Sequence, residues 1–238
     1  MELVLAFVVL LLAAGAQAVT SFGYVMLSVP VLALLFDPHT AVVAAVMSSG
    51  LTTLFGWRRE RAHVDGRSVR WLTLGGILGI PVGLLIFTRV DANLLLLAIG
   101  VITLVMTVLI LARTRLPGGV PAELTAGLIS GALVTTTGTN GPPIVLALQA
   151  QHLPPPVFRA TIQAIFTLQG VVAVTGLAIT GKITVLALTL VALSVPAGLI
   201  GWRLGDRIFH RLTPERVRLV VLAALLVSGT TLVIAALS

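Results

Sequence analysis

The chain has 238 residues, a mean hydropathy of +1.12 and only 10% charged residues, so it is far more apolar than a soluble domain. Its net charge of +7 comes from arginines between apolar segments, without the basic stripe and interleaved aromatics of a nucleic-acid-binding surface. The absence of cysteine excludes disulfides, thiolate metal sites and thiol catalysis. We expect an all-α polytopic integral membrane protein whose surroundings are the lipid bilayer and which has no nucleic-acid partner.

Charges and turn residues divide the chain into eight apolar segments. In chain order these are 3–36, 40–57, 71–88, 93–112, 124–149, 160–180, 183–202 and 217–237. Most have close to the roughly 20 residues that a helix needs to cross the hydrocarbon core. The first segment is too long for one comfortable crossing, and the fifth is interrupted by polar residues.

The interruption in the fifth segment is the run Thr-Thr-Thr-Gly-Thr-Asn-Gly-Pro-Pro at positions 135–143. Backbone that leaves the helical ladder inside a bilayer must be satisfied by protein, water or ligand. Transporters commonly bind their substrates at such broken helices. The first segment contains a related break at residues 20–24, followed by Pro30.

Short stretches recur in the same order in the two halves of the chain. Residues 28–34 resemble 141–148, and residues 80–85 resemble 195–200. Between these pairs, Ser49-Gly50-Leu51 lies where the second half has Gln169-Gly170-Val171. The shared order indicates an internal duplication.

The arginines predict how the chain crosses the membrane. They concentrate in residues 58–70 and 203–218, and the positive-inside rule puts both regions in the cytoplasm. Five apolar segments separate the two regions, so one of the five must make no net crossing. Segment 124–149 is the natural candidate, because its break can turn the chain back as a re-entrant hairpin. This topology leaves only Arg89 and Lys182 of the basic residues outside.

By the internal repeat, segment 3–36 is expected to be a hairpin too, although its two legs are nearly long enough to cross separately. The predicted fold is therefore two inverted repeats, each a broken hairpin plus three transmembrane helices, with both termini outside. The first repeat is 1–112, with hairpin 3–36 and helices 40–57, 71–88 and 93–112. A cytoplasmic linker covers 113–123. The second repeat is 124–238, with hairpin 124–149 and helices 160–180, 183–202 and 217–237.

The two breaks supply the candidate substrate-binding residues. A half-helix that starts in mid-membrane directs N–H groups and a positive dipole end toward the cavity, which suits an anion. Hydroxyl and amide side chains add donors, and glycines let the backbone approach the ligand. The predicted site consists of Gln17, Thr20, Ser21, Gly23, Thr136, Thr137, Gly138, Thr139, Asn140, Gly141 and Gln169.

Other interpretations of these polar residues stay open. Threonines in membrane helices often bond to a carbonyl one turn back, and Gln169 serves equally well in helix packing. His39 and His152 are interpreted as interfacial residues rather than gates, and Arg159 as a positive-inside residue rather than an anion ligand. The carboxylates all lie at segment ends or in loops, which disfavours a carboxylate-based proton antiporter. The spans carry no H-E-x-x-H or G-x-S-x-G motif, so we expect neither an enzyme nor a bound metal or cofactor.

The paired half-repeats, the two breaks and the Gly-Leu-Ile-Ser-Gly-Ala stretch at Gly127–Ala132 resemble the TauE/SafE family of sulfite and organosulfonate exporters. The resemblance covers nearly the whole chain. It implies a secondary transporter of the plasma membrane that exports a small, often sulfur-containing anion by alternating access. Alternatives are a transporter of another small metabolite such as a carboxylate or amino acid and, less favoured, a membrane scaffold that transports nothing or an intramembrane enzyme. A transporter this small is compatible with a homodimer, which no residue of the sequence specifies.

Overall fold

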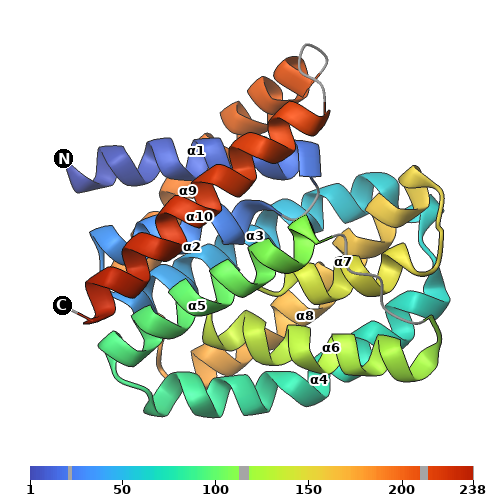
Figure 1. The fold of residues 1–238 in the computed structure, drawn as a ribbon, viewed down its shortest axis with the longest axis horizontal. Coiled ribbons are helices and arrows are strands. Elements are labelled where there is room, and N and C mark those ends of the chain that lie inside the picture. The colour runs from blue at the N-terminus through green and yellow to red at the C-terminus, as the bar shows by residue number, and fades with distance from the viewer. Residues whose placement is uncertain (21–22, 113–117, 210–213, 238) are drawn as a thin grey trace.

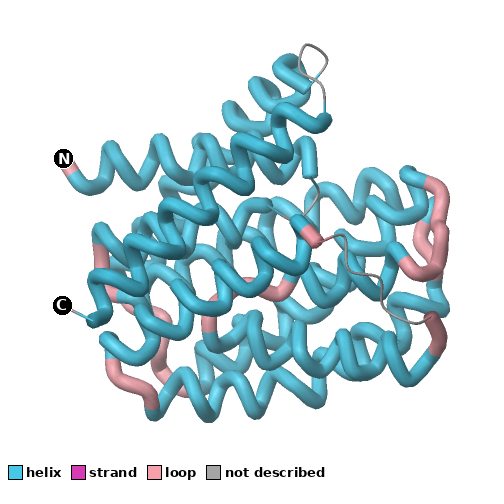
Figure 2. The backbone as a smooth tube through the Cα atoms, in the orientation of Figure 1, coloured by secondary structure: helices cyan, strands magenta, loops and turns pink. Residues whose placement is uncertain are grey.

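The structure is a computed structural model that describes residues 1–20, 23–112, 118–209 and 214–237. Within these ranges the chain is helical and contains no strand (Figure 2). The helices are α1 Glu2–Thr20, α2 Gly23–Leu35, α3 Pro38–Glu60, η1 Arg61–His63, α4 Gly66–Arg89, α5 Ala92–Leu111, α6 Val120–Thr136, α7 Gly141–Gln149, α8 Pro155–Ile179, α9 Val185–Phe209 and α10 Pro214–Leu237. In the described residues α3 with η1, α4, α5, α8 and α9 are long and apolar enough to cross a membrane.

Several helices begin at aspartates that cap their first turn. The side chains of Asp37, Asp65 and Asp91 accept hydrogen bonds from the third following backbone N–H, at 3.0, 3.0 and 2.8 Å. Such caps satisfy donors that a helix start leaves unpaired. They also explain why helices extend beyond the apolar segments. Helix α6 starts at Val120, inside the predicted linker 113–123, with a proline in its first turn rather than a side-chain cap.

The helices run roughly along the long axis of the molecule, which has two distinct ends (Figure 1). Both chain termini and the α2–α3, α4–α5 and α8–α9 connections lie at one end, here called the termini end. The α3–α4 and α7–α8 connections lie at the opposite end. We call this the arginine end, because the exposed Arg58, Arg59, Arg61, Arg67 and Arg70 belong to it.

Helices α6 and α7 form a hairpin that starts and finishes at the arginine end. Nε2 of Gln151, just after α7, donates to Oε1 of Glu123 in the first turn of α6 at 2.7 Å. The chain therefore returns to the end from which it entered. From Glu123 to Thr136 the helix rises by about 20 Å, which is less than the ~30 Å hydrocarbon core. Helices α1 and α2 form the corresponding pair from the termini end (Figure 1).

The closest helix packing joins α4 to α6. Gly75, Gly79 and Gly83 lie four residues apart on one face of α4, where added Cβ atoms would collide with the α6 backbone or its neighbours. Gly127 and Gly131 of α6 face the α4 backbone in the same way. Small residues at this spacing let membrane helices approach to van der Waals contact.

Three further packings follow a regular pattern. Helix α1 packs on α9, where Gly201 faces the backbone of Leu11. Helices α3 and α8 cross at Gly50 and Gly170, since a Cβ on Gly170 would stand 3.8 Å from the Cα of Gly50. Helices α5 and α10 meet at Gly100 and Gly229, since a Cβ on Gly229 would stand 3.3 Å from the Gly100 oxygen. The buried apolar core fills the space between these helix pairs.

Candidate functional site: a buried break between two half-helices

The break at residues 137–140 separates α6 from α7. Gly138 has φ +74°, a left-handed conformation that glycine adopts without a steric penalty. Pro142 and Pro143 then stand in the first turn of α7, where a missing N–H costs nothing. The sequence thus ends one helix and starts the next within four residues. Thr137, Thr139 and Asn140 are 0%, 1% and 8% exposed, so this non-helical backbone is buried inside the protein.

The threonine hydroxyls of the break bond within their own segment. The Thr136 hydroxyl donates to the Ala132 carbonyl oxygen at 2.9 Å, and the Thr137 hydroxyl lies 3.4 Å from the Leu133 carbonyl oxygen. The Thr139 hydroxyl lies 3.4 Å from the Thr137 carbonyl oxygen. These are the local bonds that threonine often makes in membrane helices. The hydroxyls would have to rotate before they could donate to a ligand.

Asn140 is the break residue with the most available donors. It precedes α7, but its side chain makes no capping hydrogen bond. Its amide therefore offers two donors beside the start of the half-helix. The prolines at 142 and 143 carry no N–H, so Gly141 supplies the remaining backbone donor of this first turn. The half-helix contributes fewer backbone donors than its position alone suggests.

Ser130 holds the break in place, and sequence reasoning missed it. Its hydroxyl lies 3.0 Å from the Asn140 oxygen and 2.9 Å from Oε1 of Gln169. Nε2 of Gln169 donates to the Leu72 oxygen at 3.2 Å. The predicted site residue Gln169 thereby ties α8 to α6 and α4, with both ends of its amide engaged. Ser130 lies within the Gly127–Ala132 stretch, so that motif was its only sequence signal.

The break packs against the first hairpin. A Cβ on Gly138 would stand 2.7 Å from Cγ1 of Val25 and 3.2 Å from Cγ2 of Val29, both in α2. The same Cβ would stand 3.7 Å from Cγ2 of Val46 in α3. The second break and the returning leg of the first hairpin are therefore in direct contact.

The predicted residues of the first break are described only in part. Gln17 is 3% exposed, and its Oε1 lies 3.4 Å from the Thr52 hydroxyl of α3. Gly23 is the buried first residue of α2. Thr20 ends α1, but its side chain lies outside the described part of the structure, and Ser21 lies outside the described residues altogether.

A group of buried hydroxyls beside this break was not predicted. The hydroxyl of Tyr24 in α2 is near Ser48 of α3 and Ser194 of α9. Tyr24 and Ser48 have no hydrogen-bond partner at normal distance, and the same holds for Ser28 one turn further along α2. Isolated hydroxyl residues at these positions gave no pattern in the sequence. Burying a hydroxyl without a partner costs free energy, and such groups are few in native structures.

The arginine end carries ionic contacts between helices. Arg159 in the first turns of α8 donates to Glu60 at the end of α3, with both its Nε and its Nη2. A cleft of about 450 Å³ is lined by these two residues with His63, Pro155 and Pro156. Glu123 nearby is 1% exposed, and its Oε1 also lies 3.3 Å from the Ser68 hydroxyl.

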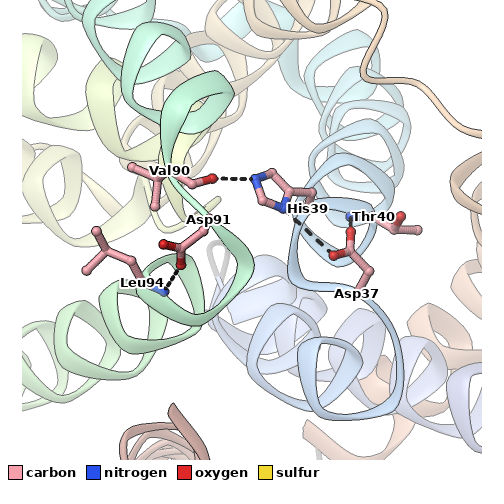
Figure 3. Close-up of polar contacts among 6 residues, drawn as sticks. All are labelled: Asp37, His39, Thr40, Val90, Asp91 and Leu94. Atoms are coloured by element: carbon pink, nitrogen blue, oxygen red, sulfur yellow. Dashed lines mark hydrogen bonds and ion pairs between the residues drawn. The ribbon is translucent and has the colours of Figure 1, made fainter. Parts of the chain in front are cut away.

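At the termini end, the His39 side chain joins the start of α3 to the end of α4 (Figure 3). Nε2 of His39, at the start of α3, lies 3.2 Å from the oxygen of Val90 after α4. The His39 ring packs edge-on against Phe87, with centroids 4.9 Å apart. Nδ1 of His39 is 3.8 Å from Asp37. These contacts agree with a packed interfacial histidine.

The hydrophobic helices, the glycine-mediated packing and the half-helix that starts at a buried polar break define a multi-pass membrane protein of the broken-helix kind. Residues 6–232 match the family described as sulfite exporter TauE/SafE, and the chain belongs to this family. The family is one of transporters, so the protein is not an enzyme.

A curated relative supports the same assignment. The chain is 29% identical over 240 residues to a "Probable sulfite/organosulfonate exporter TauE" of Cupriavidus necator. The match covers 96% of this chain and 93% of the relative. No solved structure matches significantly.

Proposed function

We propose that this protein is a secondary transporter that exports sulfite, an organosulfonate or a related small anion and binds it at the α6–α7 break. The burial of Thr137, Thr139 and Asn140 in a non-helical segment carries the proposal. Irregular backbone at membrane depth is tolerated where it is enclosed by protein or lines a cavity. The Asn140 amide and the Gly141 N–H offer the donors that a compact oxyanion requires.

The helix contacts support two inverted repeats, 1–112 and 124–238, around a shared axis. The hairpin helices α1 and α6 each pack on the helix before the last of the opposite half, namely α9 and α4. Equivalent helices pack on each other, α3 on α8 and α5 on α10. Gly50 and Gly170, which the repeat alignment equates, meet at the α3–α8 crossing. Residues on a two-fold axis meet their own equivalents in this way.

Alternating access would then move the two halves around a site between the two broken hairpins. The contact of Gly138 with Val25 and Val29 supports this position, because it joins the second break to the first hairpin. The arginine end faces the cytoplasm in this proposal, and both termini lie outside the plasma membrane. Sulfur-containing anions are favoured because the curated relative is named for them.

A binding assay on purified protein tests the substrate class. An anion that binds only the folded state, present at a concentration one hundred times its Kd, stabilises that state by about 2.7 kcal/mol. We expect sulfite or methanesulfonate to raise the unfolding temperature, with acetate and alanine having no effect. Stabilisation by acetate or alanine alone would assign a carboxylate or amino acid as the substrate instead.

Substitution tests the site. Asn140→Ala combined with Thr139→Val is expected to abolish sulfite flux from liposomes and sulfite-dependent stabilisation, while the protein still folds. Thr175→Ala is the matched control, because Thr175 is an exposed threonine that bonds to Val171 in its own helix at 2.8 Å. Normal sulfite flux in the double variant would disprove the break as the binding site.

A further inference from the structure

The cleft at the arginine end is placed where an anion would approach the transport pathway from the proposed cytoplasmic side. Arg58, Arg59 and Arg61 are exposed beside it at the end of α3 and in η1. None of these three arginines lines the cleft itself. Within the cleft, Arg159 is the cation that forms part of the wall.

The helix start beneath Arg159 supplies few donors of its own. Helix α8 begins after Pro154 with Pro155 and Pro156, none of which has an N–H. The usual backbone donors of a helix N-terminus are therefore mostly missing. An anion in this cleft would depend on the guanidinium itself, whose planar fork matches a sulfonate or sulfite as well as a carboxylate.

Glu60 occupies that fork in the present structure. The carboxylate receives Nε of Arg159 at 3.2 Å at one oxygen and Nη2 at the other. Among the described residues this is the one ion pair between different helices. The Arg159 side chain is 41% exposed, so an anion can reach it without unfolding the helix. Exposed ion pairs of this kind are weak and exchange readily.

A polar side chain lies directly behind the ion pair. Gln163 is one turn deeper along α8, is 2% exposed and has no hydrogen-bond partner for its Oε1. Its amide fills the space beside Gly56, which is one turn deeper along α3. The pairs Glu60–Arg159 and Gly56–Gln163 thus form successive layers between α3 and α8. These layers lead from the cleft toward the Gly50–Gly170 crossing at the centre.

A second bond keeps α8 in place when the ion pair opens. The backbone N–H of Asp65 donates to the Thr161 hydroxyl at 2.9 Å. This bond involves neither Glu60 nor Arg159, so displacing Glu60 from the guanidinium does not break it. Glu60 can therefore leave Arg159 while α8 stays attached to the α3–α4 connection.

We propose that Arg159 is an access site for the transported anion and that Glu60 is a latch, displaced when the anion takes its place on the guanidinium. Opening the latch exposes Gln163 and the space between α3 and α8. The inference rests on the proposed function for the identity of the anion. The latch itself can be tested without any substrate.

The rate at which a single cysteine reacts with a maleimide shows whether the Glu60–Arg159 pair is open, and the native chain contains no cysteine that would interfere. Gln163→Cys is expected to react slowly with a membrane-impermeant maleimide in the otherwise native protein. Adding Glu60→Gln or Arg159→Gln should speed the reaction by about threefold, as breaking an exposed ion pair that contributes roughly 0.7 kcal/mol would do. Pro156→Cys, at the exposed rim of the cleft, should react rapidly in every background and reports that the protein is folded and accessible.

Anion dependence separates the access site from the latch. Methanesulfonate, which unlike sulfite does not add to the maleimide, should speed labelling of the Gln163→Cys variant in the native background and should have no further effect in the Arg159→Gln background. In transport with sulfite on the arginine side, Arg159→Gln should raise KM by about tenfold with little change in kcat, which marks a lost binding contact. Glu60→Gln should lower KM, and Arg58→Gln, which removes the same charge outside the cleft, should leave it nearly unchanged.

The outcomes distinguish this proposal from that for the break. Equal labelling of Gln163→Cys in all backgrounds would overturn the latch, and equal KM changes for Arg58→Gln and Arg159→Gln would overturn the access site. Asn140→Ala should instead abolish flux while leaving the labelling pattern of Gln163→Cys intact. If flux persists in Asn140→Ala while Arg159→Gln raises KM, the break proposal fails and the access site stands.

Discussion

At the scale of single residues, Gly138 is the position where backbone conformation and packing meet. An alanine there must adopt a left-handed φ, which costs about 1–2 kcal/mol. Its Cβ would also stand 2.7 Å from Cγ1 of Val25, and such overpacking costs about 1–3 kcal/mol. We therefore expect Gly138→Ala to lower the free energy of unfolding by about 3 kcal/mol, measured by denaturation in detergent.

Gly181→Ala is the control for the conformational part. Gly181 has φ +67° and open space around its Cβ position, so its substitution should cost only about 1 kcal/mol. Adding Val25→Ala to Gly138→Ala should recover part of the packing loss. If the two glycine substitutions cost the same, the contact between the break and α2 contributes nothing.

Asp65 gives a prediction about pH. The hydrogen bond from Ser68 holds the pKa of the Asp65 carboxyl below its ordinary value, and the Ser68 and Arg67 backbone N–H groups and the Arg67 charge act in the same direction against desolvation. Folding thus favours the ionised form. The resulting stability is fully present above the unfolded pKa of about 3.9 and is lost as pH falls through the lower folded pKa.

Asp65→Ala is therefore expected to lower the free energy of unfolding by about 1 kcal/mol at pH 7, as the loss of a helix cap does. The difference from the native protein should shrink as pH is lowered below about 4, because the Asp65 carboxyl of the unfolded chain takes up a proton there and that of the folded chain follows only at lower pH. Denaturation curves of both proteins between pH 7 and pH 3 measure this difference in the free energy of unfolding. A difference that stays constant over this range would show that the ionised carboxylate is not what stabilises α4.

The position of the break and its polar residues could be predicted from the sequence, whereas the hydrogen-bond partners of those residues could not. Thr137, Gly138 and Asn140 were identified because polarity and helix-breaking residues coincide in an apolar segment. Which hydroxyls stay available depends on rotamers and on the course of the loop. Those features have no signature in sequence. Ser130 was missed for a related reason, since one serine in an apolar helix resembles any other until its neighbours are known.

At the scale of helices, the α4–α6 contact predicts a graded response to alanine. Gly79 faces the Leu128 backbone, which cannot rotate away, so Gly79→Ala should cost about 3 kcal/mol. Gly176 faces only the Leu84 side chain, with Cδ2 at 3.0 Å, and Leu84 can change rotamer. Gly176→Ala should therefore cost about 1 kcal/mol or less.

Gly66 completes this series as a helical glycine with nothing within 4 Å of its Cβ position. Gly66→Ala should leave stability unchanged or raise it by about 0.5 kcal/mol, because alanine has the higher helix propensity. Thermal unfolding of the three variants measures the order. Equal stabilities for Gly66→Ala and Gly79→Ala would mean that α4 and α6 are not in backbone contact.

The apolar segments predicted the helices well and their ends less well. Helix α8 starts five residues before the apolar segment 160–180, because prolines and capping, rather than hydropathy, decide where a helix begins. Helix α6 starts inside the predicted linker for the same reason. The partners of each helix were also beyond sequence reasoning. The glycines of α4 show that a close contact exists, but α6 as the partner emerges only from the fold.

At the scale of the whole molecule, the sidedness of the connections tests the predicted reversal at 137–140. Arg67 and His152 are exposed at the arginine end, and Asp91 and Gly181 are exposed at or beside connections of the termini end. Single cysteines at these four positions can be labelled by an impermeant maleimide from either side of the membrane.

We expect Arg67→Cys and His152→Cys to react from one side, and Asp91→Cys and Gly181→Cys from the other. The comparison is sharp because α4 and α5 bring the chain back to the side of Arg67 before α6 begins. A single crossing by residues 124–149 would then place His152 opposite Arg67, whereas a hairpin places them together. Labelling of Arg67→Cys and His152→Cys from opposite sides would therefore contradict the re-entrant hairpin, and the inverted repeat built on it would fail as well.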